Sequence, residues 1–507
     1  MAYSTVTIVG RLPAWVSLAL VLLLTGGTLL AVALRAEVGR GFAPADWAAI
    51  RFTVMQAIGS AFVSVVLAIP VARALARRRF RGRGLLVMLL GAPFLLPVIV
   101  AVLGLLAVFG RGGIINAGLD LAGIAPVSIY GAGGVILAHV FFNLPLAVRL
   151  LLQGWLAIPA ERFRLAAQLN APLFRLLELP MLARVVPGTA LVIFLICLTS
   201  FAVALTLGGG PRATTVELAI YQAVRFDFDL GRAALLACVQ FGLCAVAAII
   251  AWRFTPLDGF GSGLDRTVAR WDQGPGDWVW LTAVTLFLLT PLAMIVWRGI
   301  PGVVALPPSV WAAAGRSLCV ASGATILSIA MALTLALRGG AIVAVVGVMP
   351  LAASALVMGT GMFLMLLPLI NPTTAALPVT LLVNAVMALP FGLRIIAPAV
   401  AEVRRSYGPL AETLGLRGWP LVRIVILPRL RRPLGFAAGL TAALAMGDLG
   451  VIALFATDGQ ETLPLAMYRL MGAYRMDAAA GASLLLLTLS LGAFWICDRG
   501  GRIDADI

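Results

Sequence analysis

The sequence predicts an all-α polytopic membrane protein with about twelve transmembrane helices. Hydrophobic residues make up 62% of the 507 residues, charged residues only 11%, and the mean hydropathy is +1.06. A soluble globular protein carries about 25% charged residues. Apolar stretches of about 20 residues recur along the chain, and each is long enough for a helix to cross a bilayer. The alternating pattern of a membrane β-barrel is absent.

The expected spans are separated by short polar segments. They centre on residues 14–34, 54–75, 85–109, 131–152, 186–207, 232–252, 278–297, 317–337, 342–368, 378–399, 433–455 and 479–497. An even number of spans places both termini on one side of the membrane. With that side cytoplasmic, about 26 arginines face inward and about 11 outward, as the positive-inside rule requires.

The net charge of +16 comes from arginine alone, because the chain contains no lysine. The arginines concentrate in alternate loops, for example at 73–83 and 404–432. That distribution indicates orientation in a lipid bilayer and argues against nucleic acid as a partner.

The two halves of the chain repeat each other in the same direction. Leu144-Pro145 recurs as Leu389-Pro390, where 390 − 145 = 245. A later Leu-Pro step recurs at a different offset, 428 − 180 = 248. We therefore expect two parallel six-helix repeats, 1–253 and 278–507, joined by a cytoplasmic linker at 254–277 that is rich in Gly, Pro and Asp. The change of offset shortens the first of two matched cytoplasmic loops by three residues.

These matched loops, near 161–184 and 402–430, each combine a short helix-forming stretch with a later Leu-Pro step. Gly415 permits a turn or a close approach, and Pro428 fits the first turn of the next helix. The alternative is an ordinary amphipathic loop. The pattern resembles the coupling loop through which an ATPase pushes the permease of an ABC importer. The residues that carry it are Ala166, Ala167, Leu169, Asn170, Leu179 and Pro180 in the first loop, and Ala411, Glu412, Leu414, Gly415, Leu427 and Pro428 in the second.

Several chemistries are excluded by residue content. A nucleotide-binding P-loop needs a lysine, so an ATPase would have to be a separate chain. His139 is the single histidine, and the five cysteines show no metal-ligand spacing. We expect no catalytic residue, no metal and no cofactor bound by this chain.

Asp448 is the one carboxylate expected in the middle of a span, the eleventh. A charge there costs about 2.5–3.5 kcal/mol on insertion scales, so the side chain should face a cavity or a partner. It is a candidate for the translocation path of a cationic solute. The alternative is a hydrogen bond between neighbouring helices.

Two blocks resemble the fused permease family of bacterial thiamine ABC importers: residues 200–222, and 447–455 with the following Thr462-Leu463-Pro464. The resemblance covers the whole chain and implies the type I ABC-importer permease fold in a bacterial inner membrane. It also implies a periplasmic protein that delivers thiamine or its phosphates, and two ATPase copies that use ATP. The polar outward loops 208–232 and 456–477 could receive the binding protein. Asn170, where a glycine is usual, and the lack of a glutamate opening either loop depart from the wider class.

Two alternatives remain at this point. A fused permease of the same fold could carry ferric iron or a polyamine, which are also cations. A secondary transporter driven by an ion gradient could likewise have twelve helices in two repeats.

Overall fold

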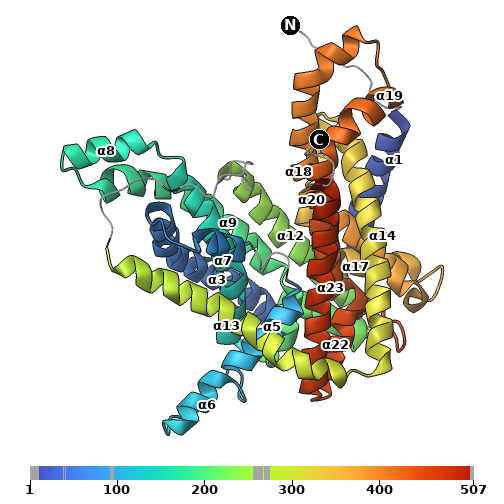
Figure 1. Ribbon diagram of the computed structural model, residues 1–507. Coiled ribbons are helices and arrows are strands. Elements are labelled where there is room, and N and C mark those ends of the chain that lie inside the picture. The colour runs from blue at the N-terminus through green and yellow to red at the C-terminus, as the bar shows by residue number, and fades with distance from the viewer. Residues whose placement is uncertain are drawn as a thin grey trace.

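The computed structural model describes residues 11–37, 39, 41–91, 96–254, 267 and 274–502, and this part of the chain forms helices and turns without a strand (Figure 1). Eleven of the described helices are long and apolar enough to cross a membrane. The prediction of an all-α polytopic membrane protein is confirmed.

The helices of the N-terminal part are α1 (Arg11–Leu22), α2 (Thr28–Arg35), α3 (Pro44–Arg77), α4 (Arg83–Leu89), α5 (Val98–Phe109), α6 (Ile114–Leu121), α7 (Ala132–Leu156), α8 (Ala160–Gln168), α9 (Leu179–Leu198), α10 (Phe201–Leu207), α11 (Val216–Arg225) and α12 (Leu230–Phe254). Those of the C-terminal part are α13 (Gly276–Val304), α14 (Pro308–Arg338), α15 (Ala341–Val346), α16 (Met349–Ala352), α17 (Ala355–Leu366), α18 (Ala376–Thr413), α19 (Trp419–Leu421), α20 (Leu427–Met446), α21 (Gly450–Phe455), α22 (Leu463–Gly472) and α23 (Met476–Arg502).

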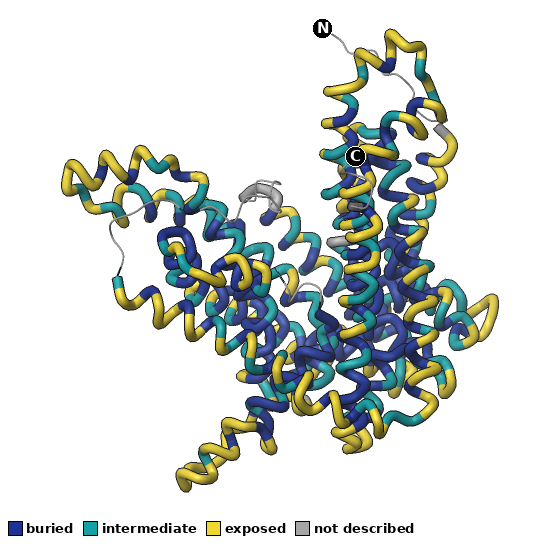
Figure 2. Tube along the Cα trace, viewed as in Figure 1, coloured by how far each residue is buried: buried dark blue, intermediate teal, exposed yellow. Residues whose placement is uncertain are grey.

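The long helices form two arms that diverge toward the end carrying α8 and α19 (Figure 1). One arm contains α3, α7 and α9, and the other contains α14, α18, α20 and α23. The largest fully buried side chain, Trp155, lies in the first arm. Exposed apolar side chains such as Phe62 and Ile326 lie on the long helices, as lipid contact requires (Figure 2).

The first helices of the two halves pack across to the opposite arm. Helices α1 and α2 contact α14 and α17, while α13 contacts α3 and α5 as well as α23. An arginine–tryptophan contact marks each crossing: the Arg338 guanidinium lies 3.8 Å from the ring centroid of Trp15, and that of Arg78 lies 5.7 Å from Trp278. The two arms are therefore interlocked by packing as well as joined by the chain.

The ninth expected span, 342–368, is not one helix, which is why eleven spanning helices are found rather than twelve. It divides into α15, α16 and α17 because Ala353 is extended and Ser354 caps the next helix. The Ser354 hydroxyl oxygen accepts a hydrogen bond from the Val357 N–H at 3.1 Å. The third expected span, 85–109, is likewise divided into α4 and α5.

Most of the linker expected at 254–277 lies outside the described residues, so its role as a boundary stays a prediction. The same hydrogen bond nevertheless occurs in both parts of the chain. The Val216 N–H donates to Thr53 Oγ1 at 2.8 Å, and the Leu463 N–H donates to Ser317 Oγ at 2.7 Å. The two donor residues differ in position by 463 − 216 = 247, and the two acceptor residues by 317 − 53 = 264.

A buried ion cluster fastens the start of α13 to the end of α3. Asp277, 4% exposed, accepts bonds from Arg77 Nε at 3.0 and 2.9 Å and from Arg78 Nε at 2.9 Å. We expect Asp277→Asn to lower the free energy of unfolding by about 3 kcal/mol, because two arginines lose the charge that balances them. Thermal unfolding in detergent measures this loss. Glu402→Gln, in an exposed pair with Arg405, is the control that should leave the melting temperature unchanged; an equal effect of both variants would contradict the prediction.

Candidate functional site

The first matched loop contains a helix end of defined geometry. Helix α8 ends at Gln168, and Asn170 adopts a left-handed φ of 48°. The Ala171 N–H bonds to the Ala166 carbonyl at 2.9 Å, and the Asn170 N–H bonds to the Ala167 carbonyl at 3.2 Å. This pair of bonds is a Schellman cap, which satisfies carbonyls that a helix end leaves free.

The second loop has the same cap at the positions offset by 245. Helix α18 ends at Thr413, and Gly415 has a φ of 65°. The Leu416 N–H bonds to the Ala411 carbonyl at 2.9 Å, and the Gly415 N–H bonds to the Glu412 carbonyl at 3.1 Å. A Cβ on Gly415 would meet nothing within 4 Å. Of the two roles that the sequence allowed this glycine, the structure shows the turn and not the close approach.

The three-residue difference between the loops falls directly after the caps. Pro172 matches Pro420, where 420 − 172 = 248, so the second loop has extra residues only between its cap and this proline. Up to the end of the cap, the two loops therefore match residue for residue at the constant offset of 245. Each carries two exposed leucines at matched positions: Leu165, Leu169, Leu410 and Leu414.

The Leu-Pro steps lie inside continuous helical segments, not at a fresh helix start. A five-residue π-helical turn precedes each step: η4 (Phe174–Glu178) and η7 (Val422–Ile426). Pro180 and Pro428 are each the second residue after the end of their turn. Proline lacks the N–H that an α-helix needs, and its ring clashes with the carbonyl four residues back. The wider π turn accommodates both effects.

The helix leading into the first loop is interrupted, whereas the second is not. Helix α7 ends at Leu156, and α8 restarts after Pro159, its N-cap residue. Helix α18 instead runs for 38 residues from the membrane-spanning part to the cap. Figure 1 shows α8 turned away to the side of its arm while α18 continues along its arm.

Asp448 is placed differently from the sequence expectation: it lies in a break, not in the middle of a helix. Residues 447–449 separate α20 from α21. Oδ1 of Asp448 accepts a bond from the Gly450 N–H at 3.3 Å, which caps α21. Oδ2 is sealed from solvent and has no hydrogen-bond partner among the described residues. No bond to a neighbouring helix is formed there, so the structure does not show the alternative interpretation of this carboxylate.

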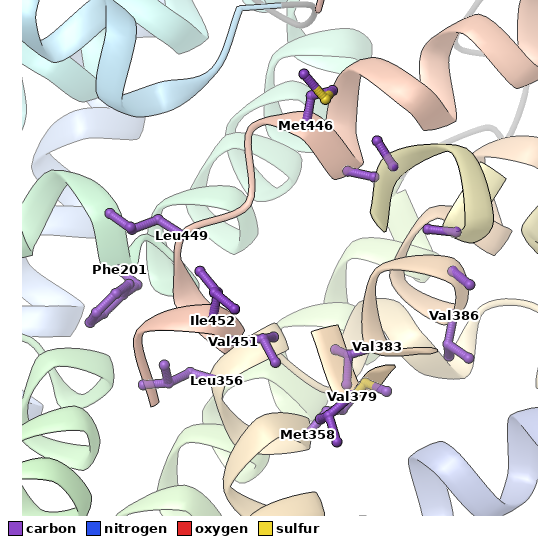
Figure 3. Close-up of a cluster of buried hydrophobic side chains, with 14 of the residues drawn as sticks. Phe201, Leu356, Met358, Val379, Val383, Val386, Met446, Leu449, Val451 and Ile452 are labelled. Atoms are coloured by element: carbon purple, nitrogen blue, oxygen red, sulfur yellow. The ribbon is translucent and has the colours of Figure 1, made fainter. Parts of the chain in front are cut away.

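The break at Asp448 faces residues of the N-terminal half. A Cβ on Gly447 would stand 3.0 Å from Pro97, which precedes α5, and one on Gly450 would stand 3.8 Å from Phe201. Figure 3 shows Phe201 beside Leu449, at the start of α21. The ring of Phe201 packs edge-on against Tyr221, with centroids 5.3 Å apart.

The N-terminal half is broken at the matching place, Thr199-Ser200, between α9 and α10. Side-chain amides satisfy the free carbonyls at this break: Gln240 Nε2 donates to Leu198 at 2.8 Å, and Gln56 Nε2 donates to Cys197 at 2.9 Å. In the other half, Asn384 Nδ2 donates to the carbonyl of Ala445 at 3.4 Å, where 445 − 198 = 247.

Sequence reasoning missed the breaks and the aromatic pair, Phe201 and Tyr221, of which Phe201 packs at the break that holds Asp448. Phe201 and Tyr221 both stand in the block 200–222 that carried the resemblance, but nothing in their spacing indicated that they pack together. Gln56 was the available signal: a polar side chain inside an apolar span needs a partner, and here that partner is a free carbonyl at the break.

Comparisons with known proteins bear on the whole chain. The thiamine transport system permease protein ThiP of Brucella abortus is 38% identical over 95% of this chain and 94% of its own length. The chain belongs to the ThiP family. The ThiP proteins of Escherichia coli and Haemophilus influenzae are 38% and 34% identical over 91% and 86% of the chain, and over 90% and 86% of their own lengths. No protein-family model matches the chain.

A bulky residue at the left-handed position should harm the second loop more than the first. Gly415→Val adds the full strain of placing a β-branched residue at a left-handed φ, about 1–2 kcal/mol. Asn170→Val adds less, because the wild-type asparagine already has part of this strain. We expect Gly415→Val to reduce transport per ATP hydrolysed more than Asn170→Val does. The assay is solute import and ATP hydrolysis in proteoliposomes that contain the assembled transporter.

Gly408→Val is the matched control, because Gly408 lies inside α18 with open space around it and no left-handed φ. Equal losses at Gly415 and Asn170 would contradict the prediction, as would an equal loss at Gly408.

Proposed function

We propose that this chain is the membrane-spanning subunit of an ATP-driven importer that moves thiamine, or its phosphates, from a periplasmic binding protein into the cytoplasm. The observation that carries the proposal is the identity of 38% across 95% of the chain to proteins named as thiamine transport permeases. The two equally capped loops add physical support, because an ATPase dimer needs two docking points of like geometry.

The ATPase is a separate polypeptide in two copies, one under each coupling loop. The exposed leucines next to the caps supply apolar contacts for it. ATP is bound there and not by this chain. The chain lies in the bacterial inner membrane with both termini in the cytoplasm, the arrangement that the arginine distribution favours.

Asp448 is the candidate contact for the solute. Thiamine carries a positive thiazolium ring, and a carboxylate oxygen without a partner, in a break that packs against Phe201, suits an aromatic cation. The aromatic face supplies cation–π attraction, and the carboxylate supplies charge. The positions of the first half that match Asp448 and its neighbours, Thr199 and Ser200, carry no acid, so solute contact is assigned to Asp448 of the second half.

Replacing Asp448 by Asn should lower the rate of thiamine import about tenfold, because the neutral amide keeps the cap on α21 but loses attraction for a cation. Import into proteoliposomes measures the rate, and co-purification with the ATPase measures assembly. Asp120→Asn, an exposed carboxylate in α6, is the control that should leave both unchanged. Unchanged import kinetics in the Asp448 variant would remove this residue from the pathway.

The decisive experiment on function is restoration of thiamine uptake at low external thiamine in cells that lack their own permease. We expect rescue only when the binding protein and ATPase are also present, and inhibition by vanadate. Rescue of ferric iron or polyamine uptake instead would identify a permease of the same fold with another cargo. Uptake that is insensitive to vanadate and driven by an ion gradient would indicate a secondary transporter.

A further inference from the structure

A buried polar contact fastens the first coupling segment to two helices of its own arm. Glu178, the last residue of the π turn η4, is fully buried. Its Oε2 accepts a bond from Arg73 Nε at 2.8 Å, and its Oε1 accepts one from Trp155 Nε1 at 3.1 Å. Arg73 belongs to α3 and Trp155 to the last turn of α7. These three residues are called the Glu178 clamp below.

The clamp also reaches the beginning of the π turn. The guanidinium of Arg73 lies 5.9 Å from the ring centroid of Phe174, the first residue of η4. Arg73 on α3 therefore contacts both ends of η4, the turn that leads into α9. The coupling helix α8 is connected to this segment through its Schellman cap and Pro172.

The second arm has no such clamp at the matching positions. The offsets set by the shared hydrogen bond, the caps and the Leu-Pro steps are 264, 245 and 248. They place Leu337, Val400 and Ile426 opposite Arg73, Trp155 and Glu178, since 337 − 73 = 264, 400 − 155 = 245 and 426 − 178 = 248. All three residues of the second arm are buried and belong to one hydrophobic cluster. The side chains that form a polar contact in one arm thus correspond to apolar side chains in the other.

The two kinds of contact respond differently to displacement. A charge-assisted hydrogen bond is directional and short, and a buried carboxylate that leaves its partner carries an uncompensated charge. Apolar burial is non-directional and changes little when surfaces slide past each other. The first coupling segment is consequently held at a fixed spacing from α3 and α7. In the second arm the matching side chains are apolar, and the polar contact found there, from the Arg404 guanidinium to the Leu337 carbonyl, joins α18 to α14 and does not involve η7.

We propose that the Glu178 clamp makes the first coupling segment move as one rigid body with α3 and α7, so that Glu178 is a positioning residue for force transmission in the first arm only. This inference rests on the proposed function, because it assumes that an ATPase displaces the loops. It reverses the simple expectation from loop length, in which the shorter loop would be the weaker connection.

The test uses the complete transporter with its ATPase and binding protein in proteoliposomes. Glu178→Gln should raise the ATP hydrolysed per thiamine imported by roughly tenfold, because the neutral amide loses the ion pair with Arg73. Asp120→Asn, which removes an exposed carboxylate in α6 outside the clamp, should leave this ratio unchanged. An unchanged ratio in the Glu178 variant would overturn the proposal.

A second variant covers the case in which Glu178→Gln fails to assemble. Arg73→Leu, Trp155→Val and Glu178→Ile together give the first arm the apolar set of the second. This triple variant removes both charges of the Arg73–Glu178 pair together, so neither leaves the other unbalanced, and it should keep a raised ratio of ATP to thiamine. A wild-type ratio in the triple variant would show that the clamp serves folding alone and would overturn the proposal.

A distance measurement tests rigidity without reference to thiamine. Spin labels at the exposed positions Arg162 in α8 and Val66 in α3 report the spacing that the clamp fixes. In the wild-type complex the spacing should be the same with and without nucleotide, and in the Glu178→Gln complex it should broaden. A nucleotide-dependent spacing in the wild type would overturn the clamp. Absence of thiamine import by the wild-type complex would instead count against the proposed function and leave this distance result standing.

Discussion

Every backbone N–H and C=O inside a bilayer must find a partner within the protein, and this constraint governs where the present fold can interrupt its helices. The breaks at Thr199-Ser200 and Asp448 leave carbonyls free at the ends of α9 and α20. Buried amide side chains supply the missing bonds, from Gln56 and Gln240 in one half and from Asn384 in the other. Such side chains can be supplied only where other helices cover the break. The interruptions therefore fall within the packed protein, close to where residues of the two halves meet.

The same constraint explains why a carboxylate is tolerated at Asp448. One oxygen replaces a backbone partner by capping α21, so part of the cost of burying the side chain is offset by a bond that the break needs in any case. The other oxygen has no hydrogen-bond partner among the described residues, and it is the one proposed to attract a cation. In an unbroken helix the carboxylate would have no structural use, and its burial would be costly. The break and the acid thus depend on each other.

The sequence predicted the helical class, most of the spans and the matched positions of the two loops. The repeat offsets succeeded because a Schellman cap is local: it needs only a residue that tolerates a left-handed φ two positions after the last helical residue. Asn170 meets that need almost as well as Gly415, so the departure from glycine did not disturb the geometry. The ninth span was predicted as one helix because apolar composition does not register the cap at Ser354. Asp448 was assigned to a continuous helix for the same reason.

Contacts between residues far apart in the chain could not be read from the sequence. Arg73 and Glu178 are 105 positions apart, and Arg78 and Asp277 are 199 apart. No local pattern marks either pair, since arginines in cytoplasmic loops are expected from membrane orientation alone. Only the packing of α13 against α3, and of η4 against α3 and α7, selects which arginine finds which acid.

The fused chain allows its halves to differ, and the differences found here are complementary. A permease built from two identical subunits must place the same residue in both arms, because a two-fold axis repeats every contact. Here the polar clamp at Glu178 is confined to the first half, and the acid at Asp448 is confined to the second. The break that Asp448 occupies nevertheless packs against Pro97 and Phe201 of the first half. Phe201 belongs to α10, which packs against α7. Under the clamp proposed above, motion of α7 would therefore change the surroundings of the carboxylate. In that proposal, rigidity in the first half and charge in the second are complementary parts of one transport mechanism.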